Sequence, residues 1–76
     1  MCIDVSGFGT ANGTLVQLWQ ATGAINQKWI ATPVSGNIYT FSPGNATPLC
    51  LDVSGLGTAN GTQVQIWQAT GAPNQQ

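Results

Sequence analysis

The feature that most constrains this chain is an internal repeat. Shifting the sequence by 48 positions aligns residues 2–28 with residues 50–76, and only six of these 27 aligned pairs differ. Repetition at a period of 20 to 50 residues is typical of folds in which one unit cannot bury its apolar face without its neighbours. We therefore expect a fold assembled from copies of one unit, with a first repeat at 2–49 and a second, truncated repeat at 50–76.

The repeated unit has the pattern of β-strands separated by turns. Short runs of alternating apolar and polar residues are interrupted by Gly, Asn and Pro, and no helical periodicity is present. Four short strands per unit favour a closed all-β barrel or a propeller, and the pattern does not distinguish these two. The expected strands are 2–5, 15–20, 27–32, 37–42, 49–53 and 63–68.

Charged side chains are nearly absent, which excludes two classes of partner. The only basic residue is Lys28, so the chain has no cationic patch to bind the phosphates of a nucleic acid or the surface of an anionic membrane. No apolar run approaches the roughly 20 residues needed to span a bilayer. We expect a folded chain with a surface of Gly, Ser, Thr, Asn and Gln, and with neither nucleic acid nor membrane as a partner.

The beginning of the chain lacks a basic segment followed by an apolar one, so we expect that any secretion signal was removed or never present. The two cysteines, Cys2 and Cys50, occupy equivalent positions of the two repeats. Equivalent positions are normally separated by a whole repeat, and we therefore expect two free thiols rather than a disulfide.

The second strand of each repeat has two different faces. In the strand at 15–20, a period of two places Val16 and Leu18 on one face and Gln17 and Trp19 on the other. The residue before Val16 is on the face of Trp19 and is Leu in one repeat but Gln in the other, which argues against a deep core there. The equivalent residues of the second repeat are Val64, Ile66, Gln65 and Trp67.

Two interpretations remain open for Trp19 and Trp67. Each ring could simply cover its own hairpin, because Trp is usually largely buried. A partly solvated Trp beside amides also suits a sugar, since the ring can face the C–H side of a pyranose while fixed polar groups take the hydroxyls. Trp29, by contrast, is expected to be a core aromatic.

The only carboxylates are Asp4 and Asp52, one in each repeat. Each precedes Val-Ser-Gly, where it could bond backbone N–H groups in an Asx turn, or it could accept hydrogen bonds from sugar hydroxyls. A glycosidase needs two carboxylates, which here would have to come from different repeats, and no His is present to activate a thiol. We therefore expect no enzyme, no cofactor and no metal site.

Several motifs recur in the same order and at constant spacing, and together they resemble the ricin-B-type lectin family, also known as family-13 carbohydrate-binding modules. They are Cys-x-Asp-Val, Asn-Gly-Thr, Val-Gln-x-Trp and Asn-Gln, and the Gln-x-Trp signature of the family is present at residues 27–29. The resemblance covers the whole chain. It implies a β-trefoil of three such lobes, each with a shallow pocket for galactose, xylose or a related sugar.

The resemblance also implies a role for five residues of each repeat. These are a hydroxyl-binding acid, a strand amide, a stacking aromatic, a loop amide, and a Gln of the Gln-x-Trp turn that supports the site. In the first repeat they are Asp4, Gln17, Trp19, Asn26 and Gln27, and in the second they are Asp52, Gln65, Trp67, Asn74 and Gln75.

The chain departs from the family pattern in three ways, the first being that it starts at the second strand of a lobe. A second cysteine that many members bridge to the Cys-x-Asp strand is absent, and the sequence stops one residue before the Trp of the second Gln-x-Trp. The near-identity of the two copies, with Met1 directly before Cys2, favours a fragment or an engineered sequence. We expect a sugar-binding lectin module, extracellular by resemblance, whose partial β-trefoil at 1–76 is completed by homo-oligomerisation; a self-assembling structural fragment with incomplete pockets is the alternative.

Overall fold

The structure is a computed structural model that describes all 76 residues, and it contains only strands and short 3-10 turns. The strands are β1 (Cys2–Val5), β2 (Val16–Trp19), β3 (Trp29–Ser35), β4 (Ile38–Pro43), β5 (Cys50–Val53) and β6 (Val64–Trp67). The turns are η1 (Ser6–Phe8), η2 (Ile25–Gln27), η3 (Ser54–Leu56) and η4 (Pro73–Gln75). All six expected strands are confirmed, although Gln27 lies in η2 rather than at the start of β3. No helix has the length and apolar character needed to cross a membrane.

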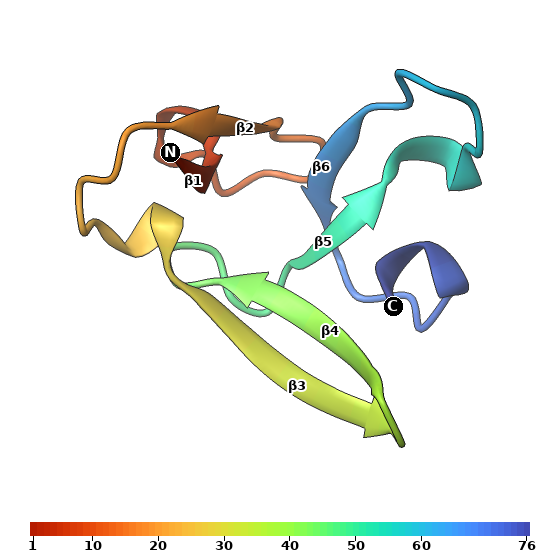
Figure 1. Cartoon of the computed structure of the whole chain (residues 1–76). Helices are drawn as coiled ribbons and strands as arrows, with labels where there is room; N and C mark the ends of the chain where they lie inside the picture. The colour runs from red at the N-terminus through yellow and green to blue at the C-terminus, as the bar shows by residue number, and fades with distance from the viewer.

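The strands form three antiparallel ribbons that extend from a common centre in different directions (Figure 1). The ribbons are β1–β2, β3–β4 and β5–β6. The first and third have the same register, which places Asp4 opposite Gln17 and Asp52 opposite Gln65. The internal repeat is therefore a repeat of structure as well as of sequence.

The core lies where the ribbons meet. Val5, Ala46 and Ile66 are buried there. Val16, Trp29 and Leu49 are partly buried and pack against them. Trp29 also donates a hydrogen bond from its indole N–H to the carbonyl of Ile3 at 3.1 Å, as a core aromatic with a satisfied polar group would. A core of this size is small, as expected for so short a chain.

The first repeat supports the second through the loop that precedes β2. Gly13 donates its N–H to the carbonyl of Ile66, and Ile66 donates its N–H to the carbonyl of Thr14. The side-chain oxygen of Asn12 accepts the N–H of Gln68. These contacts cover the outer edge of β6, and in Figure 1 the loop before β2 runs to that strand.

The outer edge of β2 has no such cover. The sequence places Leu18 on the core face with Val16, but its side chain is 68% exposed, whereas the equivalent Ile66 is fully buried. Leu18 therefore lies on the strand face that the period of two predicts, but it is not buried in the single chain. Leu18 is on the same face of its strand as Val16, but no neighbouring lobe packs against this edge of β2.

The β3–β4 ribbon is exposed along most of its length. Its exposed apolar side chains are Ile30, Val34, Ile38, Tyr39 and Phe41. Cys2 and Cys50 are both free, as expected from their equivalent positions. The chain therefore has two equivalent pairs of strands around a small core, one of them with a bare outer edge, and a third ribbon that is largely exposed.

Candidate functional site

Each repeat folds a carboxylate into a cradle of side-chain amides. Asp4 is only 4% exposed and lies at the end of β1. Its Oδ1 accepts a hydrogen bond from Gln17 Nε2 at 3.1 Å. Its Oδ2 accepts one from Asn26 Nδ2 at 3.0 Å and one from Gln27 Nε2 at 2.9 Å. Three amide donors thus offset the loss of water that burial imposes on the charge.

The second repeat builds the same cradle around Asp52. Gln65 donates to Oδ1 at 3.1 Å, and Asn74 and Gln75 donate to Oδ2 at 3.2 Å and 2.9 Å. Asp52 is 5% exposed. The agreement of the two cradles, bond for bond, shows that the strand register and the 3-10 turn together position the amides.

Gln27 fixes the loop that closes the site. Its Nε2 also donates to the carbonyl of Gln20 at 2.9 Å, and its Oε1 accepts the N–H of Thr22 at 2.8 Å. One side chain therefore joins the end of β2, the following loop and the buried carboxylate. In the second repeat Gln75 makes the same contacts with Gln68 and Thr70. The family resemblance implies a supporting role for these two Gln residues, and the structure places both against the buried carboxylates.

Of the two interpretations of the Asp residues, the structure decides only the Asx turn. Neither carboxylate accepts a backbone N–H, so the Asx turn is wrong. The loop amides are committed as well, because Asn26 Nδ2 also donates to the carbonyl of Val5 at 3.0 Å and so uses both of its protons. Asp4 Oδ1, which accepts a single bond, and the remaining donor and acceptor of Gln17 are among the polar groups left for a ligand.

An open hollow lies over each cradle. Beside Asp4 it measures about 410 Å³, and beside Asp52 about 380 Å³, at the lower end of the range for small-molecule sites. The first hollow is lined by Asp4, Ser6, Gly7, Phe8, Gln17, Trp19, Thr22 and Asn26. The second is lined by Asp52, Gly55, Leu56, Trp67, Thr70, Ala72 and Asn74.

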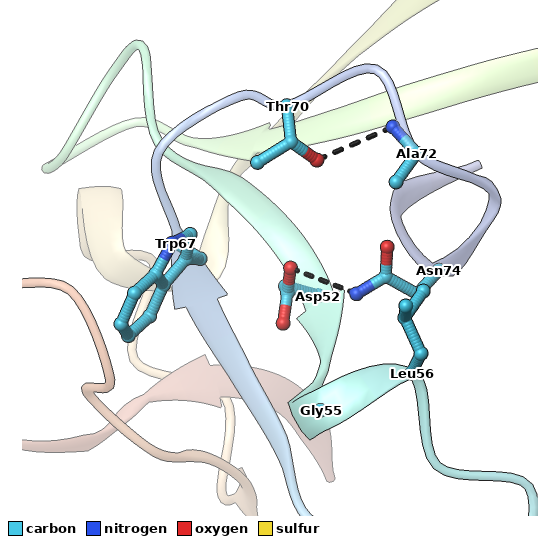
Figure 2. Close-up of a pocket in the computed structure, with 7 residues that line it drawn as sticks. All are labelled: Asp52, Gly55, Leu56, Trp67, Thr70, Ala72 and Asn74. Atoms are coloured by element: carbon cyan, nitrogen blue, oxygen red, sulfur yellow. Dashed lines mark hydrogen bonds between the residues drawn. The ribbon is translucent and has the colours of Figure 1, made fainter.

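An aromatic ring forms one side of each hollow. Figure 2 shows Trp67 from β6 on one side of Asp52 and Leu56 from η3 on the other. Trp19 is 52% exposed, and Trp67 is half-buried. Gln17 lines its hollow, whereas Gln65 donates to Asp52 but does not line the second one. The solvated face expected for the Trp residues is therefore present in the structure.

The wall opposite the Trp is a residue that the sequence did not single out. Phe8 and Leu56 are exposed by 53% and 60% and have φ of 58° and 59°, a left-handed conformation that side chains other than Gly rarely adopt. Gly7 and Gly55 before them also have positive φ. Such strain persists where the surrounding structure holds it, often at binding sites. The signal in the sequence was an apolar residue inside a polar, Gly-rich loop.

Asn26 and Asn74 each keep one buried oxygen, Oδ1, without a hydrogen-bond partner. In Figure 2 the oxygen of Asn74 points away from Asp52. No group of three or more His, Cys, Asp or Glu side chains lies close enough together to hold a metal ion. The site is therefore a set of neutral amides around one negative charge, under an apolar wall, with the chemistry of hydrogen bonding and stacking.

Comparison with known proteins places this arrangement in a family. Residues 1–67 match the family described as ricin-type beta-trefoil lectin domain-like. The chain belongs to this family. The match covers the whole first cradle and extends to Asp52, Gln65 and Trp67 of the second repeat, and it ends before Asn74 and Gln75.

The fold comparison agrees. The structure is similar to a designed 3-fold symmetric protein, ThreeFoil, with a TM-score of 0.91 and 26% sequence identity over 96% of this chain. The chain spans about half of that protein, 51% of its length. No curated protein matches the chain. The lobes described above are thus β-trefoil lobes, and about half of a trefoil is present.

Proposed function

We propose that the chain is a carbohydrate-binding lectin module with one shallow pocket per repeat. The observation that carries the proposal is a pairing found in both repeats. A buried carboxylate held by three amides lies beside a pocket wall formed by the Trp 15 residues further along the chain, exposed in Trp19 and half-buried in Trp67. A pyranose offers hydroxyls on its edge and C–H groups on its face, and it can use both halves of this site at once. Membership of the lectin-like family supports the same conclusion.

The expected ligands are galactose- or xylose-type sugars, including lactose and xylan fragments. The site is built for a neutral ligand, because the only charge in it is already bonded to amides. The pockets have no second carboxylate to act with the first, so the module binds sugar without cleaving it. By family membership we propose an extracellular location.

The decisive experiment is a calorimetric titration of the chain with galactose, lactose and xylose, extended by a glycan array. We expect micromolar to millimolar binding that is insensitive to salt, since the ligand carries no charge. The control is the double variant Trp19→Ala, Trp67→Ala, which removes both rings and should lose binding while it keeps its far-UV circular dichroism. Binding by the control equal to that of the parent would contradict the stacking role.

A second candidate function is a self-assembling structural unit with incomplete pockets. The uncovered outer edge of β2 favours this candidate, as does the similarity to a designed symmetric protein. Both candidates share one element, which we also propose: copies of the chain associate. Absence of sugar binding in an associating protein would identify the structural unit.

A further inference from the structure

The chain contains one contact between its two lobes. It also contains the two surfaces of a second, equivalent contact, which are not joined within the chain. The made contact joins the loop of the first repeat to β6 through the three hydrogen bonds of Asn12, Gly13 and Thr14, at 2.8, 2.9 and 3.0 Å. The loop of the second repeat has the same residues, Asn60, Gly61 and Thr62. Within the chain, the side-chain oxygen of Asn60, the N–H of Gly61 and the carbonyl of Thr62 have no partner.

The receiving edge is also duplicated. In β6 it consists of the N–H and carbonyl of Ile66 and the N–H of Gln68. In β2 the equivalent groups belong to Leu18 and Gln20, and no loop is bonded to them. The free groups of the second loop are therefore complementary to those of the β2 edge. The oxygen of Asn60 could accept the N–H of Gln20, and the N–H of Gly61 and the carbonyl of Thr62 could pair with the carbonyl and N–H of Leu18, as in the contact that is made.

From these matched edges we infer that the loop at 60–62 of one copy pairs with the β2 edge at 18–20 of a second copy. The inference rests on the proposed self-association and specifies its surface. The occupant is a second copy because the chain itself contains one instance of the contact, with the same loop sequence and a nearly identical strand. The two strands differ only in Leu18 for Ile66.

Burial of apolar side chains favours the same contact between copies as the hydrogen bonds do. Leu18 is 68% exposed and lies beside Met1, which is 89% exposed, in an open apolar hollow. At the contact that is made, the equivalent Ile66 is fully buried and packs with Val5 of the first repeat. The residue equivalent to Val5 is Val53, which a second copy would bring to Leu18. An exposed strand edge with an apolar side chain is the kind of surface that pairs with another chain.

The contact also bears on a pocket. A side chain at Gly13 would meet the ring of Trp67 at 3.8 Å, so the loop of the first repeat lies close to that indole. Trp19 has no such neighbour and is 52% exposed. In the associated state Gly61 of the second copy occupies this place, and the two pockets become alike.

The contact is heterologous, because the two surfaces that meet lie in different repeats. Copies joined in this way keep one free loop and one free edge, so association can continue beyond two chains. This property allows a test by mixing. A copy with a blocked edge and a copy with a blocked loop cannot associate alone, but together they can form one contact.

The edge-blocked variant is Leu18→Lys, which puts a charge on an exposed position of the strand edge. The loop-blocked variant is Asn60→Lys, which removes the acceptor for Gln20. Val34→Lys is the matched control for added charge, because Val34 is 49% exposed on the β3–β4 ribbon, away from this contact. Asn12→Lys is the matched control for the loop, since it damages the contact within the chain instead.

Sedimentation velocity over a concentration series, without sugar, is the measurement. We expect the parent and Val34→Lys to exceed the single-chain mass as concentration rises. Each blocked variant alone should associate at least about tenfold more weakly, as loss of a hydrogen bond and a buried side chain predicts. An equal mixture of the two should form a one-to-one complex of twice the single-chain mass and no larger species.

Three results would overturn the inference: a parent of single-chain mass at every concentration, blocked variants that associate like the parent, or a mixture that associates no better than its components. Asn60→Ala, a milder change, guards against a folding defect, and circular dichroism should show the parent's spectrum for all loop and edge variants except Asn12→Lys. Sugar titration of each blocked variant is a separate readout. Loss of sugar binding with intact mixing behaviour would reject the lectin proposal and leave this contact standing.

Discussion

The two repeats are nearly the same sequence, yet the structure treats them differently. The edge of β6 is covered by the loop of the first repeat, and Ile66 is fully buried; the edge of β2 is bare, and Leu18 is 68% exposed. The cradles of Asp4 and Asp52 nevertheless agree bond for bond. The comparison teaches that the site is a property of one lobe, whereas burial of the core is a property of two neighbouring lobes.

The largest predicted effect comes from truncating the equivalent strand residues. Ile66→Ala should lower the free energy of unfolding by about 2–5 kcal/mol, because it leaves a cavity in the small core. Leu18→Ala should change it by less than about 0.5 kcal/mol in the single chain, since that side chain is mostly in water. Denaturant titration at a concentration where the chain is single measures both. If Ile66→Ala does not fold, Ile66→Val, expected to cost about 0.5–1.5 kcal/mol, replaces it; equal effects at the two positions would break the comparison.

The sequence predicted the parts of the structure that depend on interactions within one repeat. Alternation along residues 15–20 placed Gln17 and Trp19 together, and the family motifs identified Asp4 and its amides. Whether Leu18 is buried could not be predicted, because that depends on a second lobe and not on the direction of the side chain. Phe8 was missed because a left-handed conformation at a residue other than Gly has no propensity signal. The sequence could not distinguish an Asx turn from an amide cradle, because both use the same carboxylate.

The next effect concerns the two carboxylates. In Asp4→Asn or Asp52→Asn, an amide NH₂ replaces one acceptor, and at least one of the three cradle donors is left without a partner at a cost of about 1–3 kcal/mol. We expect sugar affinity to fall at the altered site. Stability should fall by similar amounts in the two variants, because each cradle includes one amide that is 4% exposed, Asn26 around Asp4 and Gln75 around Asp52. Unfolding and sugar titrations of the two variants measure both quantities. An unchanged affinity would show that the carboxylate does not contact the sugar.

Removal of single Trp rings gives a smaller effect that sharpens the comparison. Trp19→Ala and Trp67→Ala should each remove one stacking surface and weaken binding at that site by about 1 kcal/mol or more. Trp67→Ala should also lower stability, because its ring is half-buried beside the loop of the first repeat, whereas Trp19→Ala should not. Calorimetry and denaturant titration distinguish these cases. Equal losses of stability would show that the loop contact does not involve the ring.

The smallest predicted effect is a difference between the two pockets themselves. The wall opposite the Trp is Phe8 in one pocket and Leu56 in the other, in the same left-handed conformation. An aromatic wall offers a second stacking face to the sugar, so we expect the Phe8 pocket to bind more tightly by about 0.5–1 kcal/mol.

Each pocket can be measured alone in a chain that lacks the ring of the other. Phe8→Leu in the Trp67→Ala background should weaken the first pocket, and Leu56→Phe in the Trp19→Ala background should strengthen the second by a similar amount. Neither exchange alters the φ that the backbone requires, because both residues already adopt it in this chain, so stability should change little. A calorimetric titration with lactose decides the matter. If the exchanges leave both affinities unchanged, the wall does not contact the sugar, and the two pockets differ only through their neighbours.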